Sequence, residues 1–96
     1  MLKVLISYDM LPGKEQECQE YFVNKLAPGL AKIGFRISDV LYTMWGESPQ
    51  ILSGGLVDDM PEAQKIFLSP PWTKLVDGIA PMTENFRVRF LQMEEN

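Results

Sequence analysis

The chain has 96 residues, of which 46% are apolar, and its 13 acidic and 9 basic residues give a net charge of −4. A chain of this length predicts a single domain, residues 1–96, that buries only about 60 to 65% of the surface exposed by its unfolded form. The core is therefore thin, and a partner subunit would enlarge it. Phosphate binding needs clustered lysine and arginine, so the acidic balance argues against nucleic acid as a partner.

The targeting and redox signals of the sequence are sparse. The longest aliphatic run near the start, Val4 to Ile6, is too short for a signal peptide or a membrane span, so we expect a cytoplasmic protein with no membrane partner. One cysteine, Cys18, excludes an internal disulfide. Because the chain has no histidine, the usual zinc ligand sets, an axial haem histidine and the commonest general base are missing. We expect no metal, haem or other cofactor.

Residues 1–9 alternate between apolar and polar side chains, which predicts a strand with one fully apolar face. Pro12 and Gly13 end this strand, and an apolar stripe at spacings of three and four then predicts a helix. The stripe consists of Cys18, Tyr21, Phe22, Leu26, Leu30 and Ile33. Pro28 lies inside this helix and removes the hydrogen bond to the carbonyl of Asn24, so we expect a kink or a restart there and an end at Gly34.

Residues 35–46 predict a second strand, with a bulged or exposed beginning near Ser38 and Asp39. Residues 46–50, GESPQ, predict a turn, and residues 51–58 predict a third strand that forms an antiparallel hairpin with the second. Gly54 and Gly55 lack the spacing of a dinucleotide-binding loop. We interpret these two glycines as places where a neighbouring element packs closely.

Asp58 and Asp59 follow the third strand, and two roles are open for them. Two close carboxylates can bind a metal or act as an acid and a base, because their repulsion raises the pKa of one of them. Asp59 also stands three residues before Glu62, which is the spacing of a helix cap. We favour the cap, followed by a second helix that includes Phe67.

The stretch SPPW, residues 69–72, predicts a corner between two helical pieces. Each proline disfavours a helical conformation in the residue before it, so we expect the second helix to end near Leu68 and Pro70 to lie outside a helix. Pro71 suits the first turn of a new short helix, and Trp72 begins the apolar stripe of that helix. We interpret Trp72 mainly as a core residue, with the wall of a ligand pocket as the alternative.

Residues 85–93 alternate again and predict the last strand, with Arg87 and Arg89 on one face. The element order is β-α-β-β-α-β, which predicts an α+β, ferredoxin-like fold: a four-stranded antiparallel sheet with both helices on one face. Leu5, Leu91 and Met93 then point away from the helices. A half-apolar open sheet is typical of a dimer surface, so we expect a homodimer through this face.

Two kinds of residue are candidates for function. Arg87 and Arg89 can bind a carboxylate ligand, but we favour pairing with acids across the sheet or the dimer interface. Cys18 has no neighbouring base in the sequence pattern, and we interpret it as a small core residue.

Aromatic residues provide the candidate pocket. Tyr8, Tyr42, Phe22 and Trp72 offer enough aromatic surface to line a small apolar pocket between helices and sheet, and they serve equally well as core. With Arg87, the residues Tyr8, Tyr42 and Trp72 are our candidate ligand-binding set. No residue of the chain is assigned a catalytic role.

Three stretches, YDMLPGKEQECQEYF (8–22), LAPGL (26–30) and SPPWTKL (69–75), resemble the dimeric α/β barrel superfamily, with its antibiotic biosynthesis monooxygenase, EthD-like and NIPSNAP-like families. The resemblance covers nearly the whole chain. It implies a homodimer whose two sheets face each other, with any active site between each sheet and its own helices. Cofactor-free oxygenases of this group hold an aromatic substrate with Asn, Tyr, Trp and Arg, and Tyr8, Trp72 and Arg87 are the residues here that fit such roles.

The chain departs from this superfamily at two positions. Leu26 stands where EthD-like sequences usually have a histidine, and residues 74–76 contain no histidine where haem-degrading members carry one. Two functions stay open. One is a module that binds a small apolar or aromatic ligand without metal or haem, and the other is a cofactor-independent monooxygenase or isomerase acting on a small aromatic or polyketide-like substrate.

Overall fold

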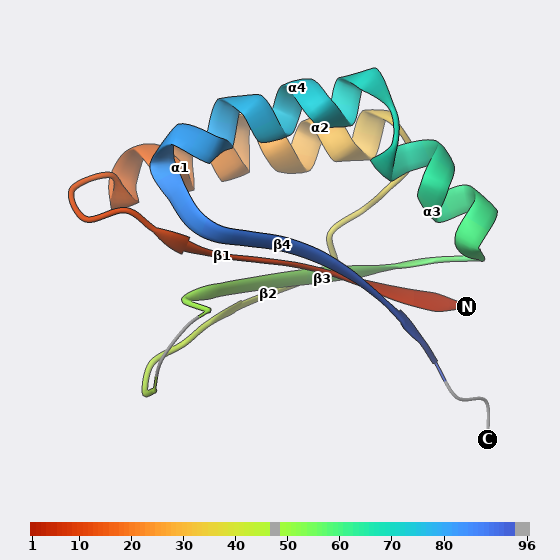
Figure 1. The fold of residues 1–96 in the computed structure, drawn as a ribbon, viewed down its shortest axis with the longest axis horizontal. Helices are drawn as coiled ribbons and strands as arrows, with labels where there is room; N and C mark the ends of the chain where they lie inside the picture. The colour runs from red at the N-terminus through yellow and green to blue at the C-terminus, as the bar shows by residue number, and fades with distance from the viewer. Residues whose placement is uncertain (47–48, 94–96) are drawn as a thin grey trace.

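Four strands form one antiparallel sheet in a computed structural model that describes residues 1–46 and 49–93 (Figure 1). The strands are β1 (Leu2–Met10), β2 (Asp39–Tyr42), β3 (Ile51–Val57) and β4 (Thr83–Gln92), in the sheet order β2-β3-β1-β4. The helical segments are α1 (Glu15–Tyr21), the π-helical turn η1 (Phe22–Leu26), α2 (Ala27–Lys32), α3 (Met60–Phe67), α4 (Pro70–Ile79) and the 3-10 turn η2 (Ala80–Met82). The predicted α+β, ferredoxin-like arrangement is confirmed.

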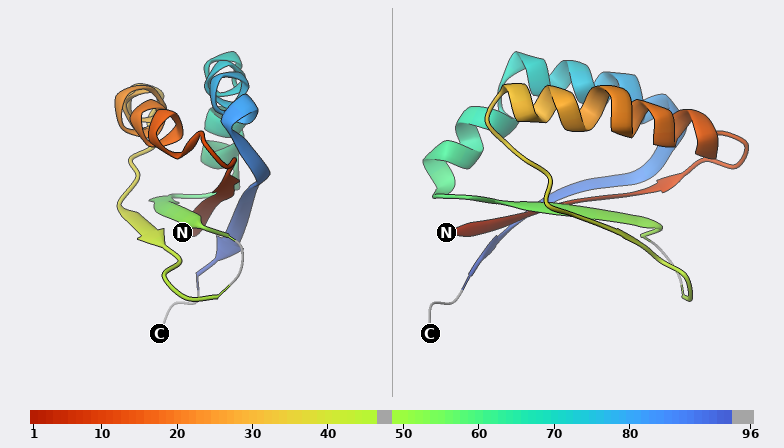
Figure 2. Two further views of the ribbon diagram at one scale, coloured as in Figure 1. Left: turned by 90° about the vertical axis from the view of Figure 1, so that its left-hand side faces the viewer. Right: turned by 180° about the vertical axis from the view of Figure 1, so that it is seen from behind.

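The helices cover one face of the sheet and leave the other face bare within the described residues (Figure 1). Segments α1, η1 and α2 form one continuous rod, α4 runs beside it, and α3 descends from the end of α4 to the sheet (Figure 2). Alternation explains the two faces, because Val4 and Ile6 of β1 are fully buried against the helices whereas Lys3 and Leu5 point the other way. We call the bare side the open face.

The strand register defines which side chains share the open face. Leu5 lies opposite Gly54 on β3 and Arg89 on β4, and Ser7 lies opposite Leu52 and Arg87. The predicted orientation of Leu5 away from the helices is confirmed. Exposed leucines lie around it: 59% of Leu41, 47% of Leu56 and 45% of Leu91 is accessible to solvent.

The first helical rod contains a proline and continues past it. Pro28 lies in the first turn of α2, directly after the wider π-helical turn η1, and the backbone stays helical through Leu26 and Ala27. The rod ends near Gly34, whose φ is +104°, and Phe35 N donates to Leu30 O at 2.9 Å. The predicted end at Gly34 is confirmed, whereas the helix does not restart at Pro28, because the π-helical turn η1 carries it past the proline.

The second strand is shorter than predicted. Strand β2 spans only Asp39–Tyr42, and all four of its residues are exposed. Residues 35–38 instead cross from the helix layer to the sheet, because Phe35 is fully buried and meets Phe67 edge to face at 5.2 Å. A Cβ on Gly55 would lie 2.6 Å from Cζ of Phe35, so the predicted close approach at this glycine is confirmed. The predicted turn at 46–50 includes residues 47 and 48, which lie outside the described residues.

The corner at residues 69–72 forms as predicted in all but one respect. Asp59 Oδ1 accepts a hydrogen bond from Glu62 N at 3.0 Å, which confirms the helix cap, and α3 ends at Phe67. Pro70, however, is helical and begins α4. The backbone nitrogens of a first helical turn need no intrahelical acceptor, and Ser69 Oγ accepts from Trp72 N at 3.4 Å, so the helix can start one residue earlier than predicted.

Candidate functional site

Three hollows border the residues that the sequence offered as ligand contacts. The corner hollow, about 300 Å³, is lined by Met60, Gln64, Phe67, Leu68, Trp72, Val88 and Phe90. The tyrosine hollow, about 120 Å³, is lined by Tyr8, Gln19, Phe22, Val23, Val40, Tyr42 and Ile51. The arginine hollow, about 410 Å³, is lined by Ser7, Pro49, Asn85, Arg87 and Arg89.

The corner hollow is apolar because two helices and a strand meet there. Helices α3 and α4 bring Phe67 and Trp72 to it, and β4 brings Phe90 from the helix-facing side of the sheet. The Phe67 ring meets Trp72 at 4.9 Å and Phe90 at 5.6 Å between ring centroids, both edge to face. Trp72 is 7% exposed, so it is a core residue, as predicted, and also part of the wall. Gln64 supplies the polar group of the lining.

The tyrosine hollow is lined by the buried phenol of Tyr8, and the buried thiol of Cys18 lies next to that phenol in the core. Burial, followed by the neighbouring Cys18 side chain, raises the pKa of Tyr8 far above its usual range. Burial also raises the pKa of the Cys18 thiol, and a side-chain hydrogen bond to Tyr8 opposes that shift. Cys18 is fully buried, so the predicted core role is confirmed. Both groups stay protonated at neutral pH and supply neither a base nor a thiolate nucleophile.

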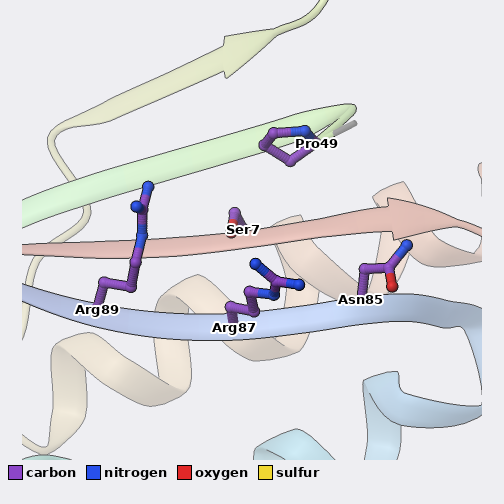
Figure 3. A pocket seen from close by; sticks show the side chains of 5 residues that line it. All are labelled: Ser7, Pro49, Asn85, Arg87 and Arg89. Atoms are coloured by element: carbon purple, nitrogen blue, oxygen red, sulfur yellow. The ribbon is translucent and has the colours of Figure 1, made fainter. Parts of the chain in front are cut away.

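The arginine hollow lies on the open face. Figure 3 shows the Arg87 side chain rising from β4 toward Ser7 and the Arg89 side chain crossing β1 toward β3. Asn85 has a φ of +57°, and the pairing of β1 with β4 shifts register beside it, between Ser7 and Asp9. Asparagine tolerates this left-handed conformation better than most residues, which suits it to the irregular position.

Asp9 anchors this end of the sheet. Its Oδ2 accepts a hydrogen bond from Asn85 Nδ2 at 2.9 Å, and its Oδ1 accepts from Gln50 N at 2.8 Å. Gln50 Oε1 in turn accepts from Met10 N at 2.7 Å. One buried carboxylate therefore joins β1 to the irregular start of β4 and to the beginning of β3, and it fixes the end of the arginine hollow where Asn85 lies.

The four predicted ligand contacts do not meet in one hollow. Tyr8 and Tyr42 lie together, Trp72 lies in the corner hollow, and Arg87 lies on the opposite face of the sheet. Phe86 connects the first two places, because its ring centroid is 5.8 Å from that of Tyr8 and 6.3 Å from that of Trp72. Ligand binding by these four residues stays a prediction.

Several lining residues escaped the sequence analysis. Met60, Gln64 and Leu68 of the corner hollow belong to or follow the predicted second helix, but the sequence pattern does not show which strand faces the rim of the hollow. Ser7 and Asn85 gave no local signal at all.

Acidic and cysteine side chains are dispersed over the described residues, and no three of them come together as a metal-binding group. Within residues 1–46 and 49–93, no helix has the length and hydropathy needed to cross a bilayer.

Comparison with known proteins places this geometry among solved structures. No protein-family model and no curated protein sequence matches the chain. An uncharacterised NIPSNAP domain protein from Burkholderia xenovorans is 17% identical, with a TM-score of 0.75 over 98% of this chain and 95% of that one. A NIPSNAP family protein from Agrobacterium tumefaciens is 15% identical, with a TM-score of 0.77 over 98% and 93%. A putative antibiotic biosynthesis monooxygenase from Nitrosomonas europaea is 12% identical, with a TM-score of 0.70 over 97% and 98%.

This chain shares the fold of NIPSNAP and antibiotic biosynthesis monooxygenase proteins. The resemblance predicted from the sequence is thus confirmed for the fold. Identities of 12 to 17% carry no residue roles from those proteins to this one.

Proposed function

We propose that the protein is a binding module that holds a small apolar or aromatic molecule in the corner hollow, without metal or haem. The observation that carries the proposal is the lining itself: six apolar side chains and one amide around about 300 Å³. Ligand pockets are typically apolar concavities of this size or larger with a few polar groups that set orientation.

The rings of the corner hollow suit an aromatic ligand. Phe67 meets Trp72 and Phe90 edge to face, so these rings turn both faces and edges toward the corner hollow. An aromatic ligand in the hollow could therefore make further edge-to-face contacts with them. The Gln64 amide can donate one hydrogen bond and accept another, which would orient a ligand that carries a hydroxyl or a carbonyl group. Leu68, 77% exposed, stands at the rim and would cover the bound molecule.

Binding is favoured over catalysis because the hollow lacks a titratable group. Proton abstraction from a substrate by the protein requires a base within hydrogen-bond reach of that substrate. None of the seven residues lining the corner hollow can take up a proton near neutral pH. The monooxygenase alternative is supported by the name of the Nitrosomonas neighbour. The residues that fit such an activity, Tyr8, Trp72 and Arg87, border three separate hollows, which counts against it.

We also propose that the protein is a homodimer through the open face. Support comes from Leu5 at the centre of that face and from the exposed Leu41, Leu56 and Leu91 around it. A cytoplasmic location belongs to the same proposal, and it is supported by the single buried cysteine, which leaves no internal disulfide to maintain.

A neutral fluorescent probe tests the ligand site. N-phenyl-1-naphthylamine should bind saturably, with one probe per chain and enhanced emission. Leu68→Glu, which places a charge at the rim of the corner hollow, should weaken this binding strongly, whereas Val23→Glu, at the tyrosine hollow, should leave it unchanged. The reverse ranking would move the site to the tyrosine hollow. Absence of saturable binding would contradict the proposal, and oxygen uptake with an added aromatic hydroquinone would favour the monooxygenase alternative.

A further inference from the structure

We propose that the arginine hollow is a second site, which binds the carboxylate or phosphate group of a small anionic molecule between Arg87 and Arg89. The site lies on the face of the sheet opposite the corner hollow and uses none of its residues. This second site is therefore additional to the proposed apolar-ligand site, and each of the two proposals can be correct or wrong without the other.

Strand geometry directs both arginines at the same space. Arg87 and Arg89 are alternate residues of β4, so their Cα atoms are about 7 Å apart and their side chains share one face. Arg87 is opposite Ser7 on β1, and its side chain turns toward that residue, while Arg89 crosses β1 toward β3 (Figure 3). Two guanidinium groups thus border a hollow of about 410 Å³.

Neither arginine has an acidic partner in the described part of the chain. The ion pairs there are Lys3 with Asp39 and Lys14 with Glu17. Arg87 and Arg89 are both exposed, and two cations on one face of a strand repel each other. A bound anion removes this repulsion.

The donor groups match an oxyanion. A guanidinium group presents a planar fork of N–H donors that binds both oxygens of a carboxylate or two oxygens of a phosphate. Ser7 adds a hydroxyl donor at the floor, and its residue is only 5% exposed, so this donor is fixed by the sheet. Two forks and one hydroxyl favour a ligand with more than one anionic oxygen pair, such as a dicarboxylate or a phosphate ester.

The same two arginines also border the surface that we propose for the dimer. If a partner covered the unpaired guanidinium groups, their charges would be buried without compensation, which is strongly unfavourable. A small anion in the hollow would compensate those charges without any acid from the second copy. Acidic side chains of the second copy are the competing occupant, and the experiment below separates the two.

Calorimetric titration of the purified protein with succinate and, separately, with inorganic phosphate tests the site at constant ionic strength. We expect saturable binding of at least one anion with one ion per chain. Arg87→Gln and Arg89→Gln should each weaken it by about tenfold to a hundredfold, the usual effect of losing a hydrogen bond to a charged group. Arg36→Gln, an exposed arginine outside the hollow, should leave it unchanged. Arg87→Lys should fall between wild type and Arg87→Gln, because it keeps the charge and loses the fork.

Three outcomes would overturn the proposal. The first is no saturable heat with either anion in folded wild-type protein. The second is equal weakening by Arg36→Gln, which would indicate nonspecific attraction. The third is a loss of self-association in Arg87→Gln and Arg89→Gln, measured by sedimentation, without any anion binding in wild type; this would assign the arginines to acids of a second copy. The neutral probe of the corner hollow should bind all of these variants, which keeps the two proposals distinguishable.

Discussion

Lys3 and Asp39 form an ion pair that passes over an intervening strand: Lys3 Nζ lies 2.8 Å from Asp39 Oδ2 on the open face. Strand β3 separates β1 from β2, and Gly54 of β3 is the residue opposite Asp39. A Cβ on Gly54 would lie 3.1 Å from Lys3 Cε, so glycine leaves room for the lysine stem. The pair ties the short edge strand β2 to the centre of the sheet.

This ion pair should make stability depend on pH in a defined direction. The hydrogen bond and the charge of Lys3 lower the pKa of Asp39 below its ordinary value. A depressed folded-state pKa adds stability above the unfolded pKa and loses it as the pH falls through the folded one. Wild type should therefore have a higher melting temperature than Asp39→Asn at pH 7. The difference should begin to shrink near the unfolded-state pKa of about 4 and should vanish only below the lowered folded-state pKa.

The comparison needs a control carboxylate and a salt series. Asp58→Asn, at an exposed position with no ion pair in the described residues, should show no such pH-dependent difference. Because the Lys3 to Asp39 pair is exposed, its effect should also shrink in 1 M salt. A melting difference that persists at pH 2 would show that Asp39 acts through something other than its charge.

Tyr21 packs directly on Gly78, so replacing Gly78 with alanine should destabilise the protein even though alanine has the higher helix propensity. Tyr21 donates a hydrogen bond to Leu75 O at 2.9 Å, and a Cβ on Gly78 would lie 2.5 Å from its Cζ. Alanine is the better helix former by about 1 kcal/mol. We nevertheless expect Gly78→Ala to lower the free energy of unfolding by about 1 to 3 kcal/mol, the usual cost of overpacking, measured by urea denaturation.

The Tyr21→Ala background provides the control for this substitution. With the ring removed, Gly78→Ala should stabilise the protein, because only the helix preference remains. Stabilisation by Gly78→Ala in the wild-type background would show that the ring moves aside at little cost.

The sequence predicted correctly those features that depend on residues close together in the chain. The alternation in residues 1–9 places Leu5 away from the helices, and the Asp59 to Glu62 spacing gives the start of α3. Both follow from neighbours within a few residues. Phe35 shows where this fails, because its apolar side chain fits a strand pattern equally well but packs under the helices against Phe67.

The hollows depended on contacts between distant parts of the chain. Asn85 adopts its left-handed conformation while its amide donates to Asp9, 76 residues earlier, and no local motif announces such a pair. The β4 alternation does separate Arg87 from Phe86, so the sequence already contained the reason why Arg87 and Trp72 lie on opposite faces. What it lacked was the position of α3 and α4 along that strand.

Trp72 should be needed for stability and for the corner hollow together. Trp72→Ala should lower the free energy of unfolding by about 3 to 5 kcal/mol, and Trp72→Phe should cost far less, because the phenyl ring keeps most of the contact with Phe67. In a Trp45→Phe background, Trp72 emission should be blue-shifted and poorly quenched by iodide. Trp72→Phe should still bind the neutral naphthylamine probe. Readily quenched emission with a stability loss below about 1 kcal/mol would mean that Trp72 is not a core residue.

If the protein dimerises through the open face, charged substitutions on that face should weaken self-association. An arginine at Leu5 would place a charge at the centre of the contact beside Arg89, so Leu5→Arg should yield monomers or insoluble protein. Leu91→Arg, at a more exposed position, should fold and shift the equilibrium toward monomer. Leu68→Arg, on the helix side, is the matched control and should remain dimeric.

Sedimentation across a range of concentrations measures these equilibria. A stable interface should bury well above roughly 1,000 Å² in total, so we expect it to cover leucines on both sides of Leu5, including Leu41 and Leu91. Dissociation should therefore be as sensitive to Leu41→Arg as to Leu91→Arg. A wild-type protein that stays monomeric at micromolar concentration would contradict the dimer, and the exposed leucines would then need another explanation.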